Sequence, residues 1–190
     1  MFNKLLQQIR ACTVCESFLP LGENPIIQAH PKSKIIIIGQ APGIKAHQSN
    51  IPWNDPSGDQ LRKWLNVTKE QFYNPKFFAL VPIGFFYPGK GKSGDLPPRK
   101  ECAPLWHERL LNEMKDVQLI LLVGQYAQKY YLKENSYQNI TENVLHFYQY
   151  LPDYFPLPHP SPRNFIWIKK NEWFIEKVLP ELKNKIKVIL

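Results

Sequence analysis

Two short polar segments of the sequence carry the residue types best suited to catalysis. Residues 39–43 read Gly-Gln-Ala-Pro-Gly and directly follow a run of four isoleucines. Residues 159–164 read His-Pro-Ser-Pro-Arg-Asn, in which prolines stiffen a turn that presents a histidine, a hydroxyl, a guanidinium and an amide together. Such a rigid polar turn is suited to gripping a strand backbone. A histidine in a loop is nevertheless more often structural than catalytic, so His159 is interpreted either as a structural residue or as a catalytic one.

The first segment also has a second interpretation, as a loop that binds a nucleotide phosphate or as a plain tight turn. Pro42 removes one backbone N–H from such a loop, and the lysine of a P-loop is missing from the segment. Phosphate binding is therefore disfavoured. Loops that follow the strands of a parallel sheet meet at its ligand-binding edge, so the pairing of the two segments is the better guide to function.

The hydrophobic pattern predicts the elements that must position these segments. Continuous apolar runs predict four strands, at residues 34–39, 77–81, 117–124 and 155–157. The remaining patterned segments predict five helices, over residues 2–10, 57–65, 101–114, 125–132 and 171–183. Pro180 is expected to bend or end the last helix. Residues 87–98 are rich in turn residues and lysine, which predicts a mobile basic loop.

Strands and helices alternate along the chain, which is typical of a parallel sheet covered by helices. We therefore expect an α/β fold with three layers, α/β/α, around a central, mainly parallel, four-stranded sheet. The length of 190 residues fits one domain over residues 1–190.

The charge balance points to a polyanionic partner. Lys and Arg number 24 against 16 Asp and Glu, which gives a net charge of +8 and makes nucleic acid the leading partner, although a generic basic protein would look the same. The sequence has three cysteines, no apolar stretch long enough to span a membrane and no export signal, so we expect a cytoplasmic monomer without a membrane partner.

The two segments together resemble the motifs of the uracil-DNA glycosylase superfamily. Its first motif follows a strand as G-E-x-P-G, G-Q-D-P-Y or G-L-A-P-A, and its second motif begins H-P-S. Residues 52–61 (PWNDPSGDQL) resemble the stretch F-T-G-D-x-S-G-D-x-L of the G-L-A-P-A branch. The resemblance covers nearly the whole chain. It implies a DNA-repair hydrolase that flips a damaged base out of DNA and cuts its bond to the sugar by water attack.

The resemblance also implies roles for individual residues. Asp55 falls on the acid that lies near the attacking water, and His159 would donate to the oxygen of the departing base, with Gln40 as a third catalytic residue. The base would be held by Gly39, Ala41, Pro42, Gly43, Trp53, Asn54, Phe85 and Ser161, with Trp53 stacked on it. DNA would be contacted by Lys90, Lys92, Arg99, Ser161, Arg163 and Asn164, with Arg163 filling the gap in the duplex.

Several of these assignments have structural alternatives. Asp55 could be a helix cap or turn residue, and Trp53 could belong to the core. Several branches read the uracil edge with an asparagine on the second central strand, where this chain has Leu80 or Val81. The resemblance therefore leaves room for other deaminated bases, such as hypoxanthine or xanthine. A weakly active DNA-binding member remains the main alternative, because Gln40 and Ala41 replace acids of other branches. A nucleotide-binding α/β protein is the second.

The cysteines resemble an incomplete cluster site. Cys12, Cys15 and Cys102 match three of the four cysteines that hold an iron–sulfur cluster in the thermostable branch. The fourth would lie near residues 83–85, where no cysteine occurs. We therefore expect free thiols, no metal and no cofactor; the alternatives are a cluster, or zinc with His107 as the fourth ligand.

Overall fold

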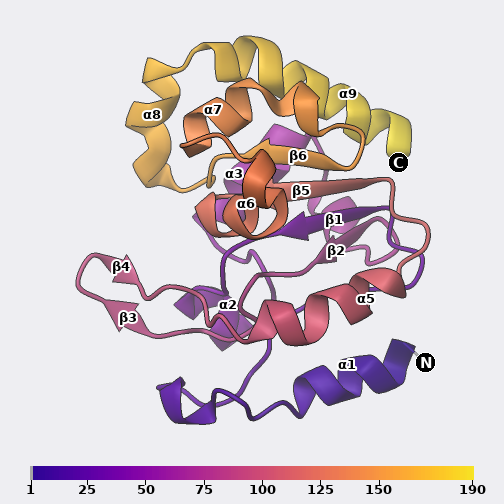
Figure 1. The fold of residues 1–190 in the computed structure, drawn as a ribbon, viewed down its shortest axis with the longest axis vertical. Coiled ribbons are helices and arrows are strands. Elements are labelled where there is room, and N and C mark those ends of the chain that lie inside the picture. Colours follow the sequence, from indigo (N-terminus) through magenta and orange to yellow (C-terminus); the bar gives the residue numbers. More distant parts are fainter. Residues whose placement is uncertain (1) are drawn as a thin grey trace.

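A four-stranded parallel sheet forms the centre of the protein, in a computed structural model that describes residues 2–190 (Figure 1). The strands are β1 (Ile35–Ile38), β2 (Phe78–Leu80), β5 (Leu119–Val123) and β6 (Tyr154–Leu157). Their order in the sheet is β2-β1-β5-β6, and all three pairings are parallel. The four predicted strands and the parallel sheet are confirmed.

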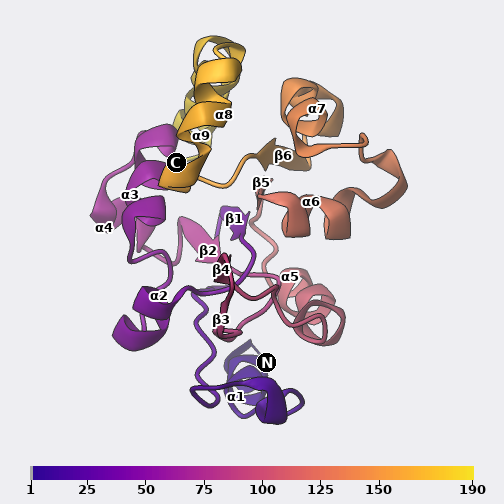
Figure 2. The ribbon, with the colours of Figure 1, turned by 90° about the vertical axis from the view of Figure 1, so that its left-hand side faces the viewer.

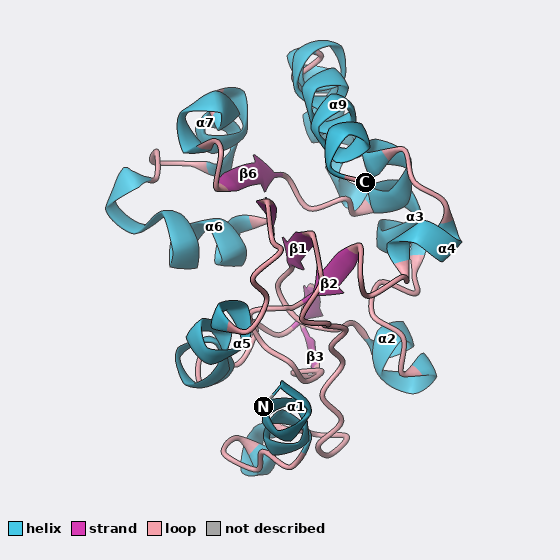
Figure 3. Ribbon diagram, turned by 90° about the vertical axis from the view of Figure 1, so that its right-hand side faces the viewer, coloured by secondary structure: helices cyan, strands magenta, loops and turns pink. Residues whose placement is uncertain are grey.

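Helices cover both faces of this sheet (Figure 3). Side chains alternate across a strand, so Ile36 and Ile38 pack into one core cluster with α1 (Phe2–Arg10), α5 (Glu108–Asn112) and α6 (Gln125–Leu132). Ile35 and Ile37 pack into the other cluster with α3 (Pro56–Leu65) and α9 (Leu179–Ile189). Each of the four isoleucines is at most 1% exposed, which explains the continuous apolar run. The three-layer α/β/α architecture is confirmed.

The five predicted helices are present, and they differ from the prediction mainly at their ends. A π-helical segment, Ala103–His107, precedes α5, and another, Phe174–Val178, precedes α9. Pro180 was expected to bend or end the last helix; it lies just after the π-helical segment, and the helix does not end there but continues to Ile189. Four short helices escaped prediction: α2 (Ile44–Ser49), α4 (Lys69–Phe72), α7 (Ile140–Leu145) and α8 (Phe165–Lys170).

The segment expected to be a mobile basic loop contains a small hairpin. Strands β3 (Lys90–Gly91) and β4 (Gly94–Asp95) pair antiparallel, and Leu96 N–H donates to the Gly89 carbonyl at 2.8 Å. Glycines permit this turn, because Gly89 and Gly94 have φ angles of +101° and +146°. The glycines of this segment have the spacing G-x-G-x-x-G, but they lie in a hairpin and not between a strand and a helix, so a dinucleotide loop is not formed.

Within residues 2–190, no helix is long and apolar enough to cross a membrane.

The three cysteines are free and buried in the core cluster beneath α1. Burial raises the pKa of the Cys102 thiol to about 12. His107 has no free ring nitrogen, because Nδ1 lies 2.6 Å from the Tyr131 hydroxyl and Nε2 lies 3.0 Å from the Pro82 carbonyl. In the described part of the chain, no three His, Cys, Asp or Glu side chains are grouped closely enough to hold a metal ion. The donor set does not fit a cluster or a zinc ion.

The start of α3 depends on close backbone packing. Asp55 caps the helix by accepting a hydrogen bond from Gly58 N–H at 2.8 Å, and Pro56 occupies the first turn. Trp53 has a φ of +58°, which is unusual for a bulky residue. Its carbonyl lies directly against Gly58, where any Cβ would collide with it.

The cysteine packing predicts that the fold does not need metal. A chelator should leave the thermal unfolding midpoint of the purified protein unchanged, and Cys102→Ala should lower the free energy of unfolding by only about 1 kcal/mol, because a small buried apolar group is lost. Calorimetry with and without chelator measures both. A brown protein that contains iron and unfolds in chelator would contradict this account.

The packing at Gly58 predicts a large penalty for a single methyl group. Gly58→Ala should lower the free energy of unfolding by about 1–3 kcal/mol through overpacking, although alanine is the better helix former. The matched control is Lys63→Ala, because Lys63 is exposed on the same helix. Urea denaturation measures both variants, and equal stabilities would show that the Trp53 carbonyl moves aside freely.

Candidate functional site

A cavity of about 470 Å³ opens at the edge of the sheet where the strands end. Figure 2 looks onto this edge, with the β3–β4 hairpin beside it. The loop after β1 and the turn after β6 both line the cavity, although β5 separates the two strands in the sheet. The volume lies in the range of pockets that enclose a small ligand such as a nucleobase.

Most of the predicted site residues line this one cavity: Gly39, Gln40, Ala41, Pro42, Gly43, Trp53, Asp55, His159, Ser161, Arg163 and Asn164. Five predicted residues do not line it: Asn54, Phe85, Lys90, Lys92 and Arg99. Lys90 and Lys92 belong to the hairpin and are exposed.

Two predicted contacts have other partners in the structure. Phe85 was expected to touch the base, but it is fully buried and stacks on His107 at 5.6 Å, so it has no surface to offer a ligand. Arg99 was expected to contact DNA, but its Nη2 lies 2.6 Å from Glu101 Oε1 and its guanidinium covers the Phe18 ring at 4.2 Å. Arg99 is therefore largely committed to intramolecular contacts.

Asp55 presents one carboxylate oxygen to the cavity and uses the other for structure. Oδ1 accepts the capping hydrogen bond of α3, whereas Oδ2 lies 3.9 Å from the position that a Cβ on Gly43 would take. The helix-cap interpretation therefore describes what the structure shows, and it leaves Oδ2 available for chemistry. The cap also fixes the direction in which Oδ2 points.

Trp53 joins the two segments. Its indole packs so closely on Gly39 that a Cβ there would lie 2.8 Å from Cζ2. On another side the indole stacks with the His159 ring, with centroids 5.8 Å apart and planes inclined by 30°. Trp53 is half-buried and forms part of the cavity wall, so it has both packing partners and a face toward the cavity.

His159 is held in a desolvated position. Burial lowers its pKa below the usual value, and the negative charge of Asp55 opposes that shift. The ring is therefore neutral at pH 7, and a neutral imidazole still donates one hydrogen bond. Asn164 closes the turn by donating from Nδ2 to the His159 carbonyl at 2.6 Å, and Gln128 Nε2 anchors the end of β6 at the Leu157 carbonyl, 2.9 Å away.

Leu80, at the end of β2, borders the cavity but is fully buried, and its side chain packs in the core cluster with Ile35 and Ile37. This position was expected to lack the asparagine of other branches, and the structure places the leucine on the cavity wall. The strand therefore offers no carboxamide that could discriminate between bases.

Sequence reasoning missed one ionisable residue of the cavity wall, Asp95 on β4. It lies in a segment that was assigned to a mobile loop, far along the chain from both motifs. The signal that could have located it is the short spacing of glycines around a central turn, which predicts a hairpin and so a fixed side chain. The other missed wall residues are mostly apolar or small: Ile26, Ala46, Pro52, Ser57, Pro82 and Gly94.

Comparison with known proteins gives two results. The chain is similar to the solution NMR structure of a candidate uracil DNA glycosylase from Methanosarcina acetivorans, with 17% identity over 82% of this chain and 94% of that one, and a TM-score of 0.45. Residues 26–183 match the family model of the uracil DNA glycosylase superfamily. This range contains both motif segments and every residue of the cavity wall. The chain belongs to the uracil DNA glycosylase superfamily.

Proposed function

We propose that the protein is a DNA glycosylase that hydrolyses the N-glycosidic bond of uracil or a related deaminated base. The observation that carries this proposal is the meeting of Asp55, Trp53 and His159 with the 39–43 loop in one cavity. Membership of the superfamily supports the same reaction class. The cavity suits a single base that has been flipped out of the DNA stack.

The two ends of the breaking bond need opposite kinds of electrostatic stabilisation. The sugar becomes oxocarbenium-like and the base leaves as an anion, so negative charge is needed near the sugar and donors near the base. Asp55 Oδ2 would supply the charge and hold water. His159 and the backbone N–H groups of Gln40 and Ala41 would donate to the base oxygen.

The preferred base follows from what the cavity lacks. Leu80 or Val81 stands where several branches of the superfamily read the uracil edge with an asparagine, and both are apolar, so this strand offers the base no side-chain hydrogen bond. A site without a paired reader discriminates weakly between bases that share a ring carbonyl beside an N–H. We therefore propose a range that includes hypoxanthine and xanthine as well as uracil.

Replacing Asp55 tests the catalytic charge without removing the helix cap. Asparagine is as good a cap as aspartate, so Asp55→Asn should keep the start of α3 and fold normally. Base release should fall by about 10² to 10⁴ while DNA binding persists. Single-turnover assays on uracil DNA measure the rate, with Asp116→Asn, an exposed carboxylate before β5, as the control. A wild-type rate would reduce Asp55 to a helix cap.

Replacing His159 tests the donor to the departing base. His159→Ala should lower the rate of base release by about 10² to 10³, the usual cost of removing one such donor. Circular dichroism checks that the fold persists. An unchanged rate would leave the backbone N–H groups as the sole donors.

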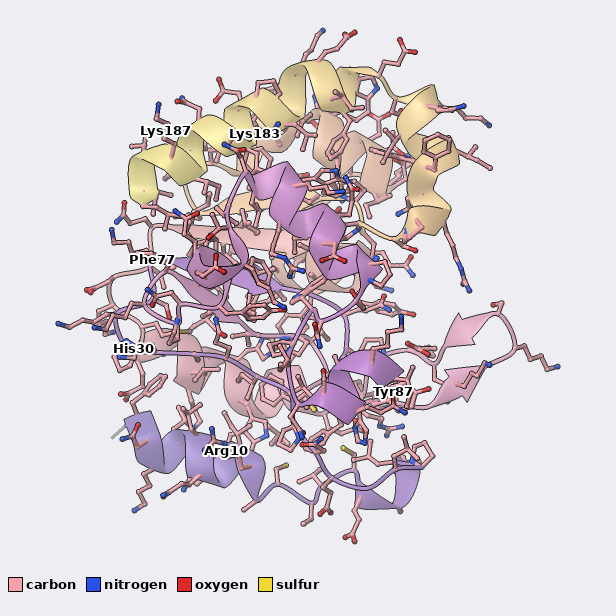
Figure 4. The ribbon with its side chains drawn as sticks, turned by 180° about the vertical axis from the view of Figure 1, so that it is seen from behind. Arg10, His30, Phe77, Tyr87, Lys183 and Lys187 are labelled. Atoms are coloured by element: carbon pink, nitrogen blue, oxygen red, sulfur yellow. The ribbon has the colours of Figure 1, made fainter. Side chains whose placement is uncertain are left out.

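The exposed lysines of the hairpin predict salt-dependent DNA binding. Affinity should fall steeply with salt through counterion release, and Lys92→Ala should reduce the log–log slope by about 1. Lys187→Ala is the control, because Lys187 lies on α9, away from the hairpin (Figure 4). A flat salt response, or equal slopes for both variants, would remove the hairpin from the DNA-binding face.

A further inference from the structure

The β3–β4 hairpin is fixed against the turn that carries His159. Arg163 Nη1 donates to the Ser93 carbonyl at 2.8 Å, and the same nitrogen lies 3.2 Å from the position that a Cβ on Gly94 would take. Asp95 follows directly and lines the cavity. Arg163, which was expected to fill the gap left in the duplex, also links the hairpin to the second motif in this structure. Asp95 is an exposed residue of the cavity wall beside this contact.

Two carboxylate oxygens flank Gly43. A Cβ built on this glycine would lie 3.5 Å from Asp95 Oδ2 and 3.9 Å from Asp55 Oδ2. Gly43 has φ −77° and ψ 171°, a conformation that any residue adopts, so backbone strain does not explain the glycine. What the glycine leaves open is a space of about one methyl group within contact distance of both oxygens, and a water molecule is of similar size.

We propose that Asp95 is a second catalytic carboxylate and that the space over Gly43, between Asp55 and Asp95, holds the attacking water. This inference rests on the proposed glycosylase function. It assigns the two carboxylates different tasks, since Asp55 has one oxygen committed to the cap of α3, whereas Asp95 stands on the β3–β4 hairpin and caps no helix.

The step balances without any further reactant. The water oxygen forms a bond to C1′ of the sugar, and the bond from C1′ to the base nitrogen breaks with its electron pair going to the base. The proton of the water goes to the Asp95 carboxylate. The base anion is stabilised by His159, and Asp55 stays ionised beside the sugar cation.

The surroundings of Asp95 suit a proton acceptor. Asp95 is exposed to solvent, yet partial desolvation raises the pKa of its carboxyl and the negative charge of Asp55 adds to this, against the effects of the Tyr87 hydroxyl and the positive charges of Arg163 and Lys90. A carboxylate of higher pKa accepts a proton more readily from water. Figure 4 shows Tyr87 beside α2, where the segment leading to the hairpin leaves the body of the protein.

The first experiment is single-turnover base release by Asp95→Asn. The rate should fall by on the order of 10² while affinity for DNA stays at the wild-type value. Asp116→Asn makes the same chemical change at the other end of the sheet and should leave the rate unchanged. In Asp55→Asn/Asp95→Asn the loss should be smaller than the product of the two single losses, because both act on one water. A wild-type rate for Asp95→Asn would overturn the proposal.

The second experiment fills the water site. Gly43→Ala places a methyl group at ordinary contact distance from both oxygens, so the protein should fold with a nearly unchanged unfolding midpoint. The rate should fall as far as in Asp95→Asn, since the methyl group displaces the water. A variant that folds and releases base at the wild-type rate would place the water elsewhere.

A third measurement separates this inference from the proposed function, because it needs no turnover. DNA that contains a cationic pyrrolidine abasic analogue mimics the charged sugar, and a neutral tetrahydrofuran abasic site is its control. Asp95→Asn should reduce the preference for the cationic analogue about tenfold and leave binding of the neutral one unchanged. Equal weakening of both would make Asp95 a structural residue of the hairpin. If the wild type releases no base but still prefers the cationic analogue, the glycosylase activity is refuted, whereas the role of Asp95 beside the sugar is not.

Discussion

The site depends on the packing of Trp53 against Gly39 and His159. The indole rests on the end of β1 because Gly39 has no side chain, and it stacks on the ring from the turn after β6. Its carbonyl meets Gly58 in the first turn of α3, the helix that Asp55 caps. One residue therefore sets the spacing between both motif segments and the direction of the Asp55 carboxylate. A bulky residue with φ of +58° is held only where its surroundings fix it.

The sheet and its carboxyl edge could be predicted from the sequence because the signals are local. Four consecutive isoleucines indicate a strand buried on both faces, and the 39–43 and 159–164 segments follow strands that end at one edge. The position of Asp95 could not be predicted in the same way. Its place depends on a hairpin only two residues long per strand and on one hydrogen bond from Arg163, a contact between residues far apart in the sequence. The assignment of Phe85 to the base pocket was wrong because an aromatic ring suits a core as well as a base pocket, so the residue type alone does not separate the two.

The cavity wall changes the kind of discrimination that the protein can apply. Leu80 and Val81 at the end of β2 are apolar and fully buried, so in the proposed function the backbone N–H groups of the 39–43 loop and His159 carry the polar recognition. The hairpin contributes on the other side, through Asp95 within the cavity and exposed lysines outside it. In the proposed function, the β3–β4 hairpin therefore contributes both to DNA binding and to the reaction at the sugar.

The proposed function requires that this cavity release a base from DNA. The most direct measurement is base release by the wild-type protein from otherwise identical oligonucleotides that contain uracil, hypoxanthine, xanthine or mismatched thymine. We expect an abasic site and free base from at least one deaminated substrate, in single- or double-stranded form. Binding of all four oligonucleotides without release of any base would contradict the proposed function.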